Sequence, residues 1–329
     1  MVSGIVFLAL VLATLIVFTS IASRRIAARF PPVGPLVETS GGVIHVVQQA
    51  GEGSGRGAVL LVHGASGNFA DMHVALADRL AGLGVQVFSV DRPGHGWSAR
   101  LAGPDASSPL RQAAALREAL TRLGVRDALV VVHSLAGALG LAMALDAPDF
   151  VRGLVLLAPV SHPWPGGVAW YYRLAAARSL GAAFRGLIVT PAGLATLRGG
   201  VRAVFDPNPT PDDYVARTRL PLMLRPAHFK ANAEDVIDVQ RRVATLSPRY
   251  REIRVPVAIV AGERDGVVST ELHAKACARE IPAARLTLLS GVGHSPHHSA
   301  PDSVVDAILD VEVRAEAARI IEALAGQPR

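Results

Sequence analysis

The sequence predicts an α/β fold with a mostly parallel, doubly wound sheet, an inserted helical cap and an N-terminal transmembrane helix. Short apolar runs alternate with helical stretches beyond residue 40, which is typical of a parallel sheet covered on both faces. A long interval breaks this alternation, and an uncharged apolar run opens the chain. We therefore predict a membrane anchor at 1–23, a basic and proline-rich linker at 24–39, a core at 40–160 and 254–329, and a helical cap at 161–253.

The N-terminal run extends from Val2 to Ala22 without a charged residue. A helix of that length, at about 1.5 Å per residue, spans roughly the 30 Å of a bilayer core. A cleaved signal peptide is the alternative, but signal peptides begin with positive charge, and here Arg24, Arg25 and Arg29 follow the run instead. This placement favours a single-pass anchor with the rest of the chain in the cytoplasm. The arginines are also expected to attract lipid headgroups.

The core strands are predicted from short runs rich in valine, leucine and isoleucine. A helix former, Ala138–Leu145, follows the fourth of these runs. In an open parallel sheet the ligand crevice lies beyond the carboxyl ends of the strands, so the loops that follow them converge. The predicted strands are 43–49, 58–62, 85–90, 128–133, 153–158, 255–261 and 285–289.

Three of these strands are each followed by a residue with catalytic chemistry. Ser134 follows the fourth strand, Asp265 the sixth and His294 the seventh. A serine hydroxyl is a poor nucleophile unless a histidine removes its proton and a carboxylate orients that histidine. We predict these three residues as a catalytic triad. Taken singly, each has a structural alternative, such as a helix cap for the aspartate or a solvated loop for the histidine.

The chain order Ser, Asp, His resembles that of the α/β-hydrolase superfamily, in particular its capped, esterase-like and lipase-like serine hydrolases. Two further segments strengthen the resemblance, which covers roughly residues 40–325. Residues 60–66 resemble the family's strand and His-Gly oxyanion loop, and residues 91–98 resemble the turn after its next strand. The resemblance implies that the backbone N–H groups of Ala65 and Leu135 bind the oxyanion. The resemblance implies no cofactor, and we predict no metal site. A weak metal site made of His297 and other residues beside His294 is the alternative.

The chain departs from the family at the nucleophile elbow. The family has Gly-x-Ser-x-Gly, whereas Val132 and Ala136 occupy the flanking positions here. Val132 is bulky for a tight turn and predicts altered packing there. The serine itself separates the chain from family members that attack with aspartate, such as haloalkane dehalogenases and epoxide hydrolases.

The predicted cap contains all four tyrosines and two of the three tryptophans. A cap over the loop end of the sheet is expected to exclude water and shape an apolar pocket. The candidate pocket residues are Trp164, Trp170, Tyr171 and Tyr172, with packing between cap and core as the alternative. His63 is a further candidate, with a structural hydrogen-bonding role as its alternative.

The net charge of +6 comes from scattered arginines, with lysine only at 230 and 275. This scatter predicts no nucleic-acid binding. The single cysteine, Cys277, allows no disulfide within the chain.

These observations together predict a membrane-anchored serine hydrolase that cleaves apolar or lipid-derived carboxylic esters. A thioesterase or C–C bond hydrolase with the same triad is the alternative enzyme. A non-catalytic binding protein on the same fold is the alternative of another class, motivated only by Val132.

Overall fold

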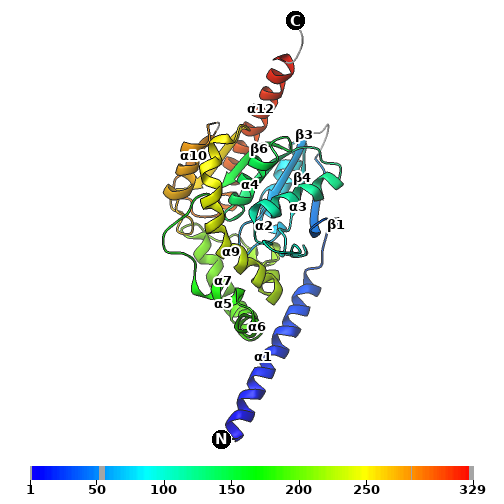
Figure 1. The fold of residues 1–329 in the computed structure, drawn as a ribbon, viewed down its shortest axis with the longest axis vertical. Helices are drawn as coiled ribbons and strands as arrows, with labels where there is room; N and C mark the ends of the chain where they lie inside the picture. The colour runs from blue at the N-terminus through cyan, green and yellow to red at the C-terminus, as the bar shows by residue number, and fades with distance from the viewer. Residues whose placement is uncertain (1, 52–55, 283, 326–329) are drawn as a thin grey trace.

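A computed structural model describes residues 2–51, 56–282 and 284–325, and it confirms the predicted α/β fold (Figure 1). One sheet has the order β1-β2-β4-β3-β5-β6-β7-β8. β2 pairs antiparallel with β1 and β4, and every other neighbouring pair is parallel. The strands are β1 (Leu36–Thr39), β2 (Gly42–Gln49), β3 (Arg56–Val62), β4 (Val85–Val90), β5 (Ala128–His133), β6 (Val151–Leu157), β7 (Val257–Gly262) and β8 (Ala284–Leu289).

Each face of the sheet covers a separate apolar core. Alternate residues of a strand therefore pack into opposite cores. In β5, Val130 and Val132 face one core while Leu129 and Val131 face the other. Burial on both faces explains why the strand is apolar throughout. The first core is covered by α3 (Pro109–Arg122), α4 (Ala136–Asp146), η4 (Glu271–Lys275) and α10 (Ala276–Glu280), and the second by α2 (Phe69–Ala81) and α12 (Pro301–Ala325).

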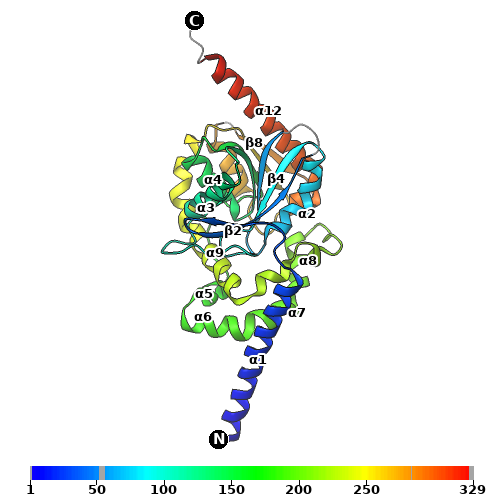
Figure 2. The ribbon, with the colours of Figure 1, turned by 90° about the vertical axis from the view of Figure 1, so that its right-hand side faces the viewer.

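The segment between β6 and β7 is helical and lies over the carboxyl ends of the strands (Figure 2). Three of its elements run on without a break from 179 to 205, and the proline-rich stretch after them is a loop. The last long helix packs against α4, which follows the predicted nucleophile. The elements are α5 (Trp170–Ala176), α6 (Ser179–Phe184), η1 (Arg185–Val189), α7 (Thr190–Phe205), α8 (Tyr214–Arg217), η2 (Leu220–Leu224), α9 (Pro226–Leu246) and η3 (Ser247–Glu252).

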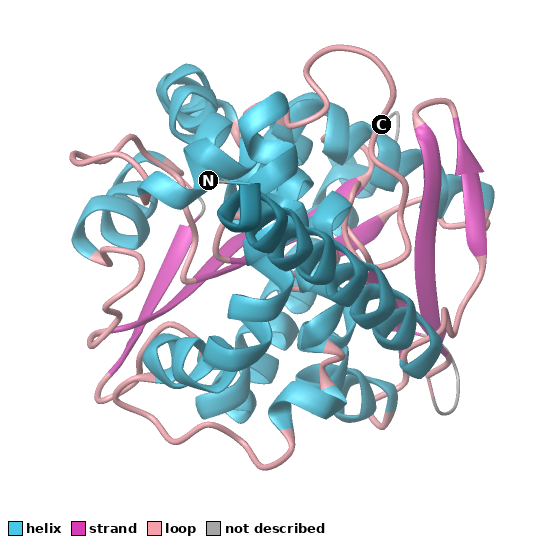
Figure 3. Cartoon of the chain, turned by 90° about the horizontal axis from the view of Figure 1, so that it is seen from below, coloured by secondary structure: helices cyan, strands magenta, loops and turns pink. Residues whose placement is uncertain are grey.

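The N-terminal helix, α1 (Val2–Arg29), extends further than the predicted anchor. It continues through the arginines because no helix breaker precedes Pro31, and it packs against η1, α7 and η2 (Figure 3). β1 occupies the end of the predicted linker, where Leu36 pairs with His45 of β2. By length and composition, α1 and the run 179–205 are each long and apolar enough to cross a membrane. α11 (Pro296–Ser299) completes the described elements.

Candidate active site

The structure brings Ser134, Asp265 and His294 together on the loops that follow β5, β7 and β8. Ser134 Oγ lies 2.9 Å from His294 Nε2, and His294 Nδ1 lies 2.8 Å from Asp265 Oδ2. When Nδ1–H donates to the carboxylate, Nε2 presents its lone pair to the serine hydroxyl. This arrangement can deprotonate the serine as the hydroxyl attacks a substrate.

Asp265 is held by its own turn. Its Oδ1 accepts hydrogen bonds from the N–H groups of Val267 at 2.8 Å and Val268 at 2.9 Å. The side chain is only 1% exposed. One carboxylate oxygen therefore fixes the loop, as the helix-cap alternative expected, while the other faces His294.

Ser134 adopts a left-handed backbone conformation, with φ of +54°. A non-glycine residue is strained there, and the surrounding hydrogen bonds hold it. Its N–H donates to Leu157 O at 2.9 Å, and its carbonyl accepts from Gly137 N at 2.8 Å. The sharp turn sets the hydroxyl beside the positive end of α4.

The bulk of Val132 is accommodated by a glycine in the helix that follows. Val132 is fully buried, and a Cβ on Gly140 of α4 would lie 2.8 Å from Val132 Cγ2. The same Cβ would lie 3.0 Å from Leu154 Cδ1. The family pattern has a glycine at position 132, which leaves space at this turn. Here Gly140 leaves the space that the Val132 side chain needs.

This complementarity gives a double-mutant cycle. Gly140→Ala is expected to destabilise the protein by about 1–3 kcal/mol through overpacking. Val132→Ala is expected to cost about 2 kcal/mol or more through a cavity. The double variant should be destabilised by at least about 1 kcal/mol less than the sum of the two single effects, because alanine at 132 makes room for the new methyl group at 140. Chemical denaturation measures all three, with Gly199→Ala, which meets no atom within 4 Å, as the control. Strict additivity would rule out this packing.

The predicted oxyanion loop lies directly against the nucleophile. A Cβ on Gly64 would come within 2.9 Å of Ser134 Cβ, so only glycine fits. Among the described residues, no hydrogen bond uses the N–H of Ala65 or Leu135. Both donors are thus available to a ligand. The loop is held by Asn232 of α9, whose Oδ1 accepts from Ser66 N at 2.6 Å, a contact that the sequence did not reveal.

Both ring nitrogens of His63 form hydrogen bonds with backbone groups. Its Nε2 accepts from Arg92 N at 3.0 Å, so Nδ1 carries the proton and donates to Gly64 O at 2.8 Å. Burial, together with the nearby Arg92 charge, lowers the pKa of His63 to about 4. The imidazole is therefore neutral at physiological pH, and the geometry favours its structural alternative over contact with substrate.

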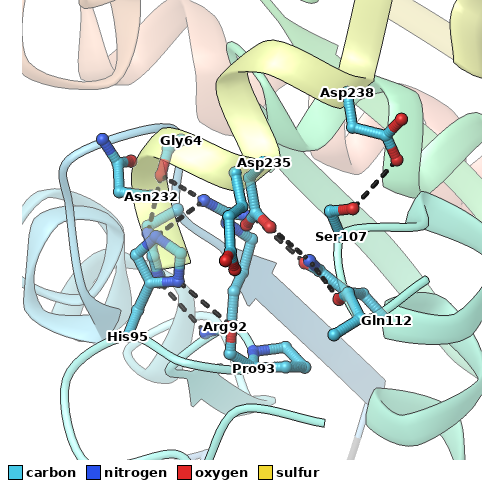
Figure 4. Close-up of polar contacts among 12 residues, drawn as sticks. Gly64, Arg92, Pro93, His95, Ser107, Gln112, Asn232, Asp235 and Asp238 are labelled. Atoms are coloured by element: carbon cyan, nitrogen blue, oxygen red, sulfur yellow. Dashed lines mark hydrogen bonds and ion pairs between the residues drawn. The ribbon is translucent and has the colours of Figure 1, made fainter. Parts of the chain in front are cut away.

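A buried ion pair joins the core to the cap (Figure 4). Arg92 and Asp235 of α9 meet at 2.7 Å, and each side chain is 1% exposed. Arg92 also donates to Gly64 O at 3.3 Å, and Asp235 accepts from Arg100 at 2.7 Å and Gln112 at 3.0 Å. The pair thus ties the cap helix to the oxyanion loop.

Asp235→Asn is expected to lower the free energy of unfolding by about 3–5 kcal/mol, because Arg92 would remain buried without its counter-ion. Glu234→Gln is the matched control on the same helix. Its carboxylate is 29% exposed, and its loss should cost less than about 1 kcal/mol. Denaturant unfolding of the two variants measures the difference. Equal losses would show that the Arg92 pair is not buried in solution.

The aromatic residues predicted for the pocket divide into two groups. Trp170 is 70% exposed and Tyr171 36% exposed, so neither side chain is enclosed here, and their contact with substrate stays a prediction. Their helix is short and presents one side to solvent. Trp164 is half-buried beside Leu135, and half-buried Tyr172 interacts with Ser66 and Asn232.

An apolar cluster includes the two predicted oxyanion residues. It combines Ala65 and Leu135 with residues from three separate segments, including the cap. The predicted nucleophile and base are covered, with Ser134 8% and His294 4% exposed. The other members are Ala138, Val160, Trp164, Val236, Val239, Val243 and Val268.

One group of described residues has the composition of a metal site, with ligand atoms of Asp71, His133 and His297 within 4.8 Å of one another. Asp71 instead accepts hydrogen bonds from His297 at 3.3 Å, His298 at 3.0 Å and the Tyr214 hydroxyl at 2.8 Å. These histidine interactions hold the pKa of Asp71 well below its usual value despite burial. His133 of this group also holds the loop that carries His294, because its Nε2 lies 2.9 Å from His294 O.

The chain is similar in sequence and fold to several known proteins. An uncharacterized protein of Mycobacterium tuberculosis is 27% identical over 282 residues, covering 80% of this chain and 78% of that protein. The magnesium-chelatase 30 kDa subunit of Rhodobacter capsulatus is 31% identical over 257 residues, covering 77% and 85%. The solved esterase of Exiguobacterium antarcticum superimposes with a TM-score of 0.63 at 18% identity, covering 85% and 99%. The model of the alpha/beta hydrolase family matches residues 59–307, and the chain belongs to that family.

Proposed function

We propose that the protein is a serine hydrolase that cleaves carboxylic esters through an acyl-enzyme on Ser134. The observation that carries the proposal is the continuous relay from Ser134 Oγ to His294 Nε2 at 2.9 Å and from His294 Nδ1 to Asp265 Oδ2 at 2.8 Å. Beside it lie the N–H groups of Ala65 and Leu135, which suit an oxyanion.

The reaction follows from these positions. Ser134 Oγ attacks the ester carbonyl while His294 Nε2 takes the hydroxyl proton. The tetrahedral intermediate collapses, and the alcohol leaves with the proton from His294. Water then attacks the acyl-enzyme, again giving its proton to His294. The acid is released, and Ser134 Oγ regains a proton from the same imidazole.

The apolar cluster around Ala65 and Leu135 supports an apolar acyl group. A thioester or a C–C bond is open to attack by the same triad, so these substrates are alternatives for the test. The binding-protein alternative rested on Val132, which Gly140 accommodates.

We also propose that α1 anchors the protein in a membrane, with the catalytic domain on the cytoplasmic side. Its described residues 3–14 are all exposed, and the run is apolar. Arg24, Arg25 and Arg29 lie at the end that joins the domain, as the positive-inside rule requires of a cytoplasmic domain.

The function is tested with full-length protein in detergent, assayed on p-nitrophenyl esters from acetate to palmitate and on matched acyl thioesters. Hydrolysis that rises with acyl length and favours the oxygen esters is expected. A strong preference for thioesters would reassign the substrate class. No turnover of any substrate by folded protein would contradict the proposal.

A further inference from the structure

The anchor helix protrudes too little to cross a bilayer unless the cap also reaches the membrane. Residues 3–14 of α1 are all exposed, whereas residues 15–26 pack against the cap along one side, where Thr19 and Ile26 are buried, and stay exposed or half-buried elsewhere. Twelve residues of helix measure about 18 Å, against about 30 Å for the hydrocarbon core. The rest of the apolar run, 15–22, must then lie in lipid too, together with the part of the cap beside it.

The part of the cap beside α1 has an apolar surface. Leu180 is 74% exposed, Ile188 45% and Leu194 40%, and all three lie on the run formed by α6, η1 and α7. Trp170, exposed on α5 nearby, is a residue type enriched at membrane interfaces. Figures 1 and 2 place this run at the end of the domain from which α1 projects. Exposed apolar side chains gathered in this way are typical of a membrane-contacting surface.

A basic groove adjoins this surface. It has a volume of about 620 Å³ and lies between α1, α7 and the loop before α8. Its lining includes Arg25 and Arg29 from α1 and Arg198 and Arg202 from α7, while Asp213 is the carboxylate among its lining residues. None of the four arginines forms an ion pair among the described residues. Their positive charge is therefore not neutralised by the protein.

We propose that α6, η1 and α7 enter the membrane that α1 spans, with their apolar surface at the boundary between acyl chains and headgroups, and that the groove binds the phosphate of an acidic phospholipid. The inference rests on the proposed membrane anchor. Guanidinium groups match phosphate oxygens with paired hydrogen bonds. The acidic leaflet attracts such residues, while Ile26, Leu194 and Val201 in the groove suit the start of the acyl chains.

Site-specific fluorescence tests the position of the cap in the full-length protein. The native Cys277 is buried and burial raises the pKa of its thiol to about 12, so a single introduced cysteine can be labelled selectively. An NBD dye is placed at Leu180→Cys on the cap, at Leu10→Cys in the anchor, or at Val313→Cys on α12, where the native valine is 69% exposed. Figure 1 shows α12 extending from the side of the domain opposite to α1. The proteins are reconstituted in phosphatidylcholine nanodiscs with or without phosphatidylglycerol.

We expect doxyl-labelled lipid to quench the dye at 180 and at 10 but not at 313, with blue-shifted emission at the two quenched sites. Quenching at 10 without quenching at 180 would overturn the membrane position of the cap while leaving the anchor intact. Absence of quenching at both sites would overturn the anchor itself, and the inference with it. Esterase activity is measured separately and does not affect either outcome.

Charge reversal tests the groove. Phosphatidylglycerol is expected to increase quenching at 180, and Arg198→Glu/Arg202→Glu should abolish that increase. Arg117→Glu/Arg126→Glu changes the net charge equally on the core, away from the cap, and should preserve the increase. Equal responses of the two double variants to phosphatidylglycerol would overturn the headgroup site. Competition by inorganic phosphate at millimolar concentration would assign the groove to free phosphate instead of lipid.

Discussion

Ser134→Ala is expected to lower kcat for ester hydrolysis by on the order of 10⁵- to 10⁶-fold, because the nucleophile is lost and the acyl-enzyme cannot form. The proposed oxyanion donors at Ala65 and Leu135 remain, so activity on the order of 10³- to 10⁴-fold above the uncatalysed rate should persist. Initial rates on the preferred p-nitrophenyl ester measure the effect.

The fold of this variant should be unchanged. Ser134 Oγ contacts His294, and alanine removes only that one atom. Near-ultraviolet circular dichroism and the unfolding midpoint serve as controls. A folded Ser134→Ala variant that retains more than a tenth of the wild-type rate would contradict the assignment of the nucleophile.

Asp265→Asn is expected to lower kcat by on the order of 10⁴-fold. Asparagine can still accept hydrogen bonds from the N–H groups of Val267 and Val268, so the turn should persist. The amide nitrogen cannot accept Nδ1–H, however, so His294 would favour the tautomer whose Nε2 carries a proton and cannot serve as the base.

Glu263→Gln is the control for this loop, because Glu263 is an exposed acid two residues away that has no contact with His294. Its kcat should equal that of wild type. A loss of less than tenfold in Asp265→Asn would show that the carboxylate does not orient the imidazole during turnover.

The parallel part of the sheet was predictable because its strands are buried on both faces. The run that forms β5 is apolar at each position from 128 to 132, which gives a strong signal. β1 was missed because it is a four-residue edge strand in which only Val37 is buried, and it directly follows the proline-rich segment. The sequence does not indicate the extra turns of α1, because charged residues after an apolar run are typical of a linker as well, although arginine favours helix.

The three triad positions could be predicted because each lies next to a recognisable strand. The contributions of α9 could not, since Asn232 and Asp235 resemble ordinary polar residues of an amphipathic helix until the cap meets the core. The role of Gly140 likewise depends on the distance between a helix and a neighbouring strand. The exposure of Trp170 follows from cap packing, which the local sequence does not encode.

Covalent labelling offers the most direct measurement of the proposed chemistry. Full-length wild type and Ser134→Ala are treated with a fluorophosphonate, digested with trypsin and analysed by mass spectrometry. The peptide 127–152 contains Ser134 as its one hydroxyl-bearing residue. A single adduct on this peptide in wild type, absent from the variant, is the expected result. Folded wild type that carries no adduct there, or the same adduct in Ser134→Ala, would contradict the assignment of Ser134 as the nucleophile.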